Sequence, residues 1–398
     1  MNTAISLAEA QARLLAGVAA LPAEEVTIAD ALGHYLAQPL VAHRTQPAAD
    51  LSAMDGYAVK AGENGPWRVA GESAAGHPFT GTVGSGEAIR ISTGALMPDG
   101  ADAVLLQENA TREGDALSLN GEGDPSERHI RRKGFDFREG DALLPVGTRV
   151  GPGQLALALA AGNAALTVHR KPSIHVFDSG DELSSDPANC ALHQVPASNA
   201  LMIVGLAKPL AGTLQVSGPV PDRLDALTQM LDTAAGADVI VTSGGASVGD
   251  HDLVYPALEA WGAEIDFWRV LMKPGKPLLV ARKGTQIVLG LPGNPVSSFV
   301  TGYLFLLPLL RALAGDTHPL PSPVMLPLGG NLPEGATRLE FLRGRLEEGE
   351  VRSFPQQDSS ALRTLALANV LIERPAGAPP APRGTLVPVY PIENGGVA

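Results

Sequence analysis

A glycine- and serine-rich loop stands directly after a strongly apolar run in the second half of the chain. The run covers residues 237–242, and the loop reads SGGASVG from Ser243 to Gly249. Consecutive glycines let backbone N–H groups converge on an oxyanion, and serine hydroxyls add further donors. The pattern predicts an anion-binding turn in an enzyme that handles a phosphorylated substrate. The expected anion-binding residues are Ser243, Gly244, Gly245 and Ser247.

Two other segments place unusual residues at the end of an expected strand. One reads FDSGDEL over residues 177–183, and the other reads GLPGNPVSS over residues 290–298. In open α/β sheets, ligands bind just beyond the carboxyl ends of the strands. Pro292 and Pro295 make the second segment stiffer than a plain turn requires. We therefore expect the three turns to shape one binding site.

The segment KPGKP, residues 273–277, supplies two positively charged side chains that could bind an anion. Its prolines hold Lys273 and Lys276 on a stiff, extended stretch, which suits two ammonium groups aimed at an oxyanion. The segment is not a Walker A loop, because no glycine stands five residues before Gly275 and a proline follows Lys276. A solvated basic turn is the alternative interpretation.

Carboxylates near these turns offer the ligands of a magnesium site. Mg²⁺ binds one or two carboxylates together with waters and substrate oxygens. For any single aspartate, a plain surface position is the commoner situation. The candidates are Asp55, Asp136, Asp181, Glu182, Asp222, Asp250 and Asp252.

The glycine loop also fits a second chemistry. Residues 245–249 match the G-x-S-x-G turn that presents a nucleophilic serine in hydrolases, which would make Ser247 the nucleophile. That chemistry needs a histidine farther along the chain, and past the immediate loop only His318 remains. His318 stands at the edge of a proline-rich stretch, a poor position for a catalytic base. Labelling of Ser247 by a fluorophosphonate would establish the hydrolase alternative.

Composition limits the protein classes that remain. A chain of 398 residues predicts two to four domains, and a net charge of −13 argues against nucleic-acid and anionic-membrane partners. The single Cys190 excludes a disulfide framework and a cysteine-based zinc site. The apolar stretch 299–310 is too short to span a bilayer, and Ser6 with Glu9 predicts a helix cap rather than a signal peptide. We expect a cytoplasmic protein.

The elements that must position these residues follow from the apolar patterns. Short alternating runs punctuated by Gly and Asp between residues 62 and 147 predict a β-rich region. From about residue 170, apolar runs alternate with helical stretches, which predicts an α/β domain with a mostly parallel sheet. In the helix expected over residues 223–235, one stripe contains Leu224, Leu227 and Leu231. Residues 296–313 predict an apolar helix, residues 319–327 a proline-rich linker, and the tail a small β-barrel or sandwich.

Together these segments resemble the molybdopterin molybdotransferase family, which includes the MoeA-like proteins and the E domain of gephyrin. Matching motifs follow the family's order over nearly the whole chain: SAMDGYA at residues 52–58, STGA at 92–95, SGDEL at 179–183, SN at 198–199, the loop 242–252, KPGKP at 273–277, GLPGNPVSS at 290–298 and FLRG at 341–344. The sequence departs from the family at Asp178, where serine is usual, and at Phe135 and Ala197.

The resemblance implies an α/β multidomain protein that forms an L-shaped homodimer. It implies residues 1–168 as an N-terminal region, with a β-rich subdomain at about 46–145 inserted in a smaller linker subdomain. Residues 169–318 would form a molybdopterin-binding α/β domain, and residues 319–398 a C-terminal β-barrel. The implied reaction inserts molybdate into adenylylated molybdopterin with Mg²⁺-dependent release of AMP. A non-catalytic molybdopterin-binding scaffold of the same fold is the alternative.

The family's functional residues carry over by position. Asp55, Asp136, Glu182, Asp222 and Asp252 would hold Mg²⁺ or polarise the attacking group, and Thr93 would support the substrate. Lys273, Lys276, Arg343 and Ser359 would form the molybdate pocket. Ser243, Gly244, Gly245, Pro292 and Pro295 would shape the pterin-phosphate site, with Ser247 as a hydrogen-bond donor. The resemblance implies a site completed across the dimer interface, and a molybdopterin adenylyltransferase is the expected upstream partner.

Overall fold

The computed structural model describes residues 4–245 and 253–392 and divides the chain into two compact units. The first unit comprises residues 1–24, 33–37 and 168–398, and the second comprises residues 25–32 and 38–167. The candidate loop residues Ser247, Asp250 and Asp252 lie outside the described residues.

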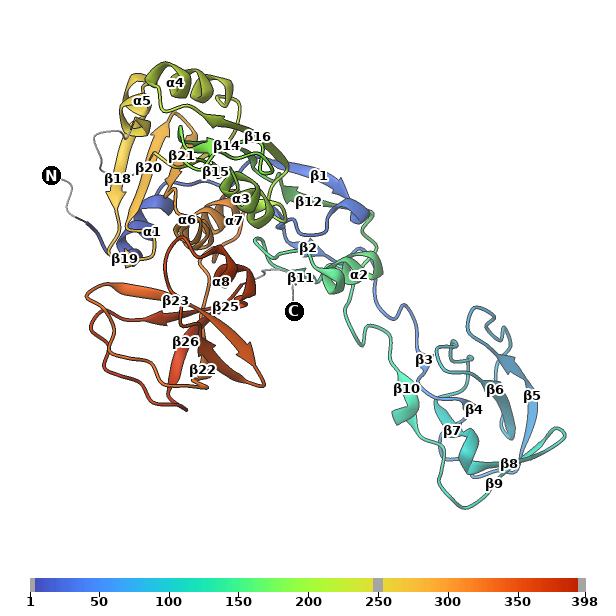
Figure 1. Ribbon diagram of the computed structural model, residues 1–398. Helices are drawn as coiled ribbons and strands as arrows, with labels where there is room; N and C mark the ends of the chain where they lie inside the picture. The colour runs from blue at the N-terminus through green and yellow to red at the C-terminus, as the bar shows by residue number, and fades with distance from the viewer. Residues whose placement is uncertain (1–3, 246–252, 393–398) are drawn as a thin grey trace. The chain divides into compact units, whose positions relative to one another are not determined.

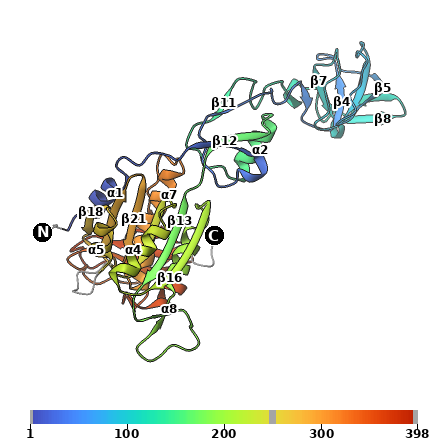
Figure 2. The same cartoon turned by 90° about the horizontal axis from the view of Figure 1, so that it is seen from above.

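A six-stranded sheet forms the centre of the first unit (Figures 1 and 2). Its β13, β16, β17 and β21 pair in parallel, and β20 and β18 continue the sheet in antiparallel fashion, so the predicted mostly parallel sheet is confirmed. The spatial order is β16 (Thr213–Val220), β13 (Ser173–Ser179), β17 (Val239–Ser243), β21 (Gln286–Leu291), β20 (Pro277–Lys283) and β18 (Glu264–Arg269).

Helices cover both faces of this sheet. One apolar cluster joins Phe177 and Ile240 to α4 (Leu224–Thr233) and α5 (Val254–Ala260). The other cluster joins the alternate strand residues, such as Val176 and Val241, to α1 (Leu7–Leu15), α3 (Asn199–Ala207) and the helix after β21. This alternation follows from the period of two along a strand, and it places the core on both sides of the sheet.

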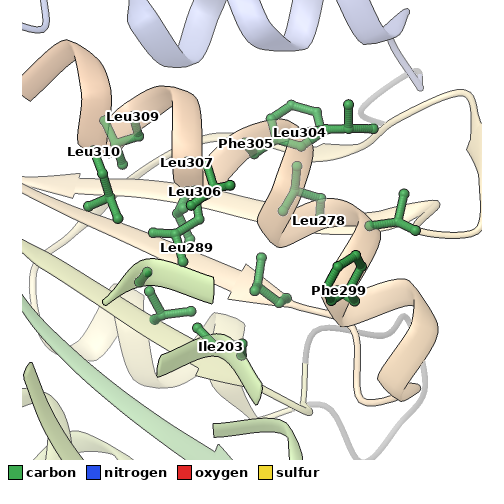
Figure 3. Packing of buried hydrophobic residues seen from close by; sticks show 14 of the residues in the cluster. Ile203, Leu278, Leu289, Phe299, Leu304, Phe305, Leu306, Leu307, Leu309 and Leu310 are labelled. Atoms are coloured by element: carbon green, nitrogen blue, oxygen red, sulfur yellow. The ribbon is translucent and has the colours of Figure 1, made fainter. Parts of the chain in front are cut away.

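The helix after β21 is the most apolar element of the chain. It runs from Pro295 to Leu313 as α6 (Pro295–Thr301), a π-helical turn (Gly302–Leu306) and α7 (Leu307–Leu313). The π turn ends just before Pro308, whose ring and missing N–H interrupt the regular ladder. The helix is longer than the expected apolar stretch 299–310, so that by length and composition it could cross a membrane, but 83% of its apolar 18-residue stretch is buried inside the protein. Figure 3 shows Phe299, Leu304 and Leu310 packed toward Leu278, Leu289 and Ile203.

Two expectations about the first unit are wrong. Leu224 does not join the buried stripe of α4: it is 43% exposed at the start of the helix, whereas Leu227 and Leu231 are buried. The expected linker 319–327 ends in a strand, because β22 (Val324–Pro327) pairs with β26 and extends the C-terminal sheet.

The C-terminal sheet has the order β19 (Met272–Lys273), β23 (Leu339–Glu347), β25 (Val370–Arg374), β26 (Leu386–Pro391) and β22, with β24 (Glu350–Ser353) beside β23. An isolated bridge between Leu328 and Val351 links the end of β22 to β24. The closed barrel of the prediction remains a prediction. Helix α8 (Leu362–Leu367) packs against α6, and Phe341 and Leu371 join the core of the central sheet.

The second unit is rich in β-structure, as predicted. Its six-stranded sheet has the order β7 (Ala103–Leu106), β4 (Gly56–Val59), β6 (Glu87–Ile91), β5 (Trp67–Ser73), β9 (Ala116–Leu119) and β8 (Ala110–Glu113). Short pairs join β3 (Leu51–Ser52) to β10 (Ile130–Arg131) and β2 (Leu40–Val41) to β11 (Ala142–Leu144). Helix α2 (Pro152–Ala160) follows, and β1 (Ala23–Thr27) pairs with β12 (Ala165–His169).

Candidate functional site

A cavity of about 740 Å³ lies at the carboxyl ends of the parallel strands β13, β17 and β21. Its volume suits a ligand larger than a simple anion. The three turns predicted from the sequence meet here. The lining comprises residues 178–180, 182–183, 195–196, 198–199, 222, 243–245, 277, 292–295, 360 and 362.

The glycine turn is fixed by steric necessity. Gly244 and Gly245 have φ angles of +98° and +61°, and a Cβ on Gly244 would lie 2.1 Å from the Ser179 carbonyl oxygen. The Gly244 N–H donates to the Leu291 carbonyl at 3.2 Å. A Cβ on Gly293 would lie 3.5 Å from the Gly244 Cα, so the two glycine turns pack against each other. The Gly244 N–H is therefore bonded within the protein rather than directed at an anion.

Asn199 and Ser243 tie the turns into a frame. The Asn199 amide donates to Ser243 Oγ at 2.9 Å and to the Gly293 carbonyl at 2.7 Å. Ser243 Oγ donates to the Pro292 carbonyl at 3.2 Å and lies 3.3 Å from Ser298 Oγ. The Ser243 hydroxyl thus has partners in the chain, and it holds the cavity wall in place.

Asp178 and Ser179 differ from this frame because each has a buried polar atom that no residue in 4–245 or 253–392 hydrogen-bonds. Asp178 is 3% exposed, and its Oδ2 accepts the backbone N–H of Ala200 at 3.1 Å. Its Oδ1 and the buried Ser179 Oγ have no hydrogen-bond partner among the described residues. Burial raises the pKa of the Asp178 carboxyl, and the Ala200 N–H opposes that rise. Both residues line the cavity.

Two of the predicted magnesium ligands line the same cavity, Glu182 and Asp222. The Glu182 carboxylate folds over Gly180, with Oε1 2.9 Å from the position of a Cβ there. The Asp181 carboxylate accepts the Asp222 backbone N–H at 3.0 Å, and this bond holds the backbone at Asp222 next to the turn that contains Glu182. Two carboxylates and substrate oxygens suit Mg²⁺. Within residues 4–245 and 253–392, however, no group of three His, Cys, Asp or Glu side chains could hold a metal.

Two of the predicted molybdate-pocket residues lie at β23: Arg343 on that strand and Lys273 on the neighbouring β19. Lys273 Nζ forms an ion pair with Glu340 at 3.0 Å, and the register of β19 and β23 places these residues opposite each other. Arg343 is fully buried, and its Nη2 donates to the carbonyls of Gln356 and Asp358 at 3.1 and 3.0 Å. Its Nε and Nη1 have no partner among the described residues. Burial lowers the pKa of this guanidinium group, opposed by Asp358.

The other two predicted molybdate-pocket residues are Lys276 and Ser359. Lys276 is exposed, has no side-chain partner within the described ranges and precedes Pro277 of the cavity wall. The Ser359 carbonyl accepts the Val296 N–H at 3.0 Å, which ties this loop to the first turn of α6. Neither side chain belongs to the cavity lining.

The remaining site candidates belong to the second unit. Asp55 Oδ1 accepts the Thr93 backbone N–H at 2.6 Å, so the structure brings these two residues together. Hydrogen bonds from the Thr93 backbone and hydroxyl lower the pKa of the exposed Asp55 carboxyl. Asp136 is exposed, and its backbone N–H donates to the Gln46 carbonyl at 3.0 Å.

The hydrolase alternative finds no support at His318. This histidine is exposed, and its Nδ1 lies 3.0 Å from the hydroxyl of the neighbouring Thr317. Ser247 itself belongs to the undescribed segment 246–252.

Comparisons with known proteins fit this architecture. Family models match successive parts of the chain: the MoeA N-terminal region (domain I and II) at residues 5–162, the probable molybdopterin binding domain at 176–312, and the MoeA C-terminal region (domain IV) at 326–392. A molybdopterin molybdenumtransferase of Haemophilus influenzae is 33% identical, with 88% of this chain and 89% of the relative aligned. The chain belongs to the molybdopterin molybdenumtransferase family.

Other members of the family agree with this assignment. A molybdopterin molybdenumtransferase of Bacillus subtilis is 32% identical over 94% of this chain and 91% of its own length. The crystal structure of a molybdopterin biosynthesis MoeA protein from Pyrococcus horikoshii superposes with a TM-score of 0.84, at 26% identity, covering 98% of this chain and 100% of that one. The chain is therefore a transferase of molybdenum cofactor biosynthesis, and the resemblance seen in its motifs is confirmed.

Sequence reasoning assigned no role to several residues of the cavity. Asn199 stood in a matching motif, yet its two amide hydrogen bonds make it the link between the turns. Asp178 was noted only as a departure from the family. A signal was present for both: Asp178 is the second-last residue of an apolar strand and Asn199 the first residue of a helix, so each is a polar residue at an element boundary.

Proposed function

We propose that this chain inserts molybdenum from molybdate into adenylylated molybdopterin and releases AMP in the same reaction. The observation that carries the proposal is the cavity, in which a glycine turn and the carboxylates of Glu182 and Asp222 line one space at the sheet edge. Hydrolysis of the phosphoanhydride bond adds the elements of water and releases AMP from the pterin phosphate. Membership of the family supports the transfer, and the cavity offers a place for the pterin phosphate.

Different residues of the chain would position the substrate and hold the metal ion. The frame of Asn199 and Ser243 holds the turns at fixed spacing, so that ligand binding requires little rearrangement. Glu182 and Asp222 would hold a Mg²⁺ ion, together with Asp252 and with the proposed ligands Asp55 and Asp136. When bound, Mg²⁺ neutralises negative charge on phosphate oxygens.

Molybdate is a tetrahedral dianion and needs cationic donors. We place it near Lys273, Lys276, Arg343 and Ser359. The support is the Arg343 guanidinium group, whose Nε and Nη1 are buried donors without partners among the described residues. A buried donor of this kind favours an anionic ligand, because leaving it unpaired is costly.

Dimer formation gives a role to three residues of the N-terminal unit, Asp55, Thr93 and Asp136. We propose that the active form is a homodimer, in which these residues from one copy complete the site of the other. Dilution to monomers then abolishes activity, and a fully active monomer contradicts the arrangement. We further propose that the protein acts in the cytoplasm and receives its substrate from a molybdopterin adenylyltransferase.

The decisive assay supplies adenylylated molybdopterin, molybdate and Mg²⁺ to the purified chain. The proposal predicts AMP in stoichiometric amounts with molybdenum-loaded cofactor, and no AMP when molybdate and Mg²⁺ are both withheld. Retention of bound substrate without AMP release contradicts the proposal and favours a non-catalytic scaffold. Glu182→Gln with Asp222→Asn is the matched loss-of-function variant.

A further inference from the structure

Asp178 presents an unusual group to the cavity, a buried carboxylate oxygen that no described residue hydrogen-bonds. The residue is 3% exposed and lines the cavity at the end of β13. Its Oδ2 is engaged by the Ala200 N–H at 3.1 Å, and its Oδ1 has no partner among the described residues. Buried polar atoms are nearly always paired, so an unpaired one beside a cavity indicates a group that a ligand satisfies.

The carboxylate also changes what the start of α3 can bind. The first N–H groups of a helix attract anions. Here Asp178 occupies one of them, the Ala200 N–H, with a negative group of the protein itself. A phosphate at this wall would meet that carboxylate at close range. This wall therefore disfavours the anionic end of a ligand and favours an N–H donor.

Ser179, the next residue of β13, presents a different group to the same cavity. Ser179 Oγ is a buried hydroxyl that has no hydrogen-bond partner in the described part of the chain, and it would lie 3.1 Å from a Cβ on Gly245. The Ser179 hydroxyl thus lies beside Gly245, and as a donor it suits a phosphate oxygen. The cavity wall therefore presents two chemically distinct groups, a hydroxyl donor at Ser179 and a carboxylate acceptor at Asp178.

We propose that Asp178 Oδ1 accepts a hydrogen bond from the amino and ring N–H edge of the pterin and so determines specificity for 2-aminopterins. The inference rests on the proposed function, because it assumes that a pterin phosphate occupies this cavity. A pterin carries adjacent N–H donors on its pyrimidine edge, whereas a lumazine carries an oxygen in place of the amino group. Asp178 therefore accepts from a pterin and repels the corresponding oxygen of a lumazine.

The test measures binding of two matched probes, a 6-alkylpterin phosphate and the corresponding lumazine phosphate, to the full chain by calorimetry. A hydrogen bond to a charged group predicts a preference for the pterin of roughly 10- to 100-fold in Kd. Asp178→Asn sharpens the test. Its amide oxygen must face the Ala200 N–H, which leaves the NH₂ group facing the ligand as a donor. The variant then loses the pterin preference and binds the lumazine more tightly than the pterin.

Two further variants complete the design. Asp178→Ser removes the carboxylate without an isosteric donor and abolishes the preference, which keeps the test valid if Asp178→Asn folds poorly. Glu264→Gln removes one exposed carboxylate from β18, the edge strand at the far side of the sheet order, and leaves the preference unchanged. Circular dichroism verifies that each variant is folded.

The outcomes separate this inference from the proposed function. Loss or reversal of the pterin preference in the Asp178 variants supports the role of Asp178. A wild-type protein that binds the pterin phosphate, with a preference that Asp178→Asn and Asp178→Ser leave intact, overturns that role and leaves the proposed function standing. Failure of the wild-type protein to bind either probe contradicts both.

Discussion

Asp178 of the central domain and Asp55 of the N-terminal unit each accept one backbone N–H, from Ala200 and Thr93 respectively. Asp178 is buried at a cavity wall, and burial raises its pKa. Asp55 is exposed, and its hydrogen bonds with Thr93 lower its pKa. Both carboxylates accept a backbone N–H, yet the pKa of Asp178 is raised and that of Asp55 is lowered. The difference arises because burial disfavours the charged form of Asp178, whereas Asp55 remains exposed.

The two regions also differ in how their shape is maintained. The cavity depends on long-range contacts, such as Asn199 with Gly293 and Gly244 with Leu291. The Asp55–Thr93 pair lies at the surface, where exposed hydrogen bonds from Thr93 and a backbone bond between Ser52 and Gly94 join two segments. The cavity is therefore built by packing of this chain alone, while the exposed pair has groups available to a partner or ligand.

The largest difference between the regions is expected for alanine at matched glycines. At Gly244, alanine combines φ of +98° with a Cβ 2.1 Å from a backbone oxygen, which the chain relieves only by moving the turn. Gly94 has φ of +81° but nothing within 4 Å of a Cβ. Urea unfolding should show a loss of about 3 kcal/mol or more for Gly244→Ala and about 1 kcal/mol for Gly94→Ala. Equal losses at both positions would contradict the steric account of the cavity.

An intermediate effect is expected from the amide that links the turns. Asn199→Ala leaves Ser243 Oγ and the Gly293 carbonyl each short of one hydrogen bond, and it should cost about 1–3 kcal/mol and weaken pterin-phosphate binding. The matched control is Asn189→Ala, which removes an exposed bond to Asp186 and should change stability by no more than about 0.5 kcal/mol. Unaltered ligand affinity in Asn199→Ala would show that the frame does not position the turns for binding.

The smallest effect is the pH dependence of the two aspartates, and its sign differs between them. The folded-state pKa of Asp178 lies above its unfolded value, so ionisation disfavours folding. Asp178→Asn should gain stability over the wild type at pH 7.5, and the gain should shrink as the pH falls toward the unfolded value of about 3.9. The folded-state pKa of Asp55 is lowered instead, so its contribution is present above the unfolded value and is lost as pH falls through the folded one.

Urea unfolding without added Mg²⁺ at pH 7.5, 4 and 3 tests both signs. Asp55→Asn should be less stable than the wild type at pH 7.5, and the difference should close below about pH 3.9. Parallel pH profiles for the two variants would contradict the comparison between a buried and an exposed carboxylate.

Much of the fold could be predicted because apolar periodicity reports burial directly. The strands β13, β17 and β21 and the helix of Leu227 and Leu231 follow this pattern. Leu224 does not, since the first turn of a helix can extend past the surface that the rest of it covers. The strand β22 was hidden in a proline-rich stretch, because its pairing depends on β26, about sixty residues farther along the chain.

The candidate site could be predicted from the sequence to about the same extent as the fold. Parallel strands share one edge for their carboxyl ends, so the meeting of three turns follows from topology. The partners of individual atoms do not follow, because Ser243 Oγ and the Gly244 N–H are engaged by Asn199 and Leu291, which are distant in sequence. The unpaired Oδ1 of Asp178 is likewise a property of the folded cavity and not of a motif.

One measurement tests the central claim, that the cavity carries out the transfer, most directly. Single-turnover release of AMP from adenylylated molybdopterin would be followed with molybdate and Mg²⁺ present, in the wild type and in the Glu182→Gln, Asp222→Asn variant. The account predicts AMP release coupled to molybdenum-loaded cofactor in the wild type and at least a roughly 100-fold slower release in the variant. Equal rates in the two proteins, or bound substrate without any AMP, would contradict it.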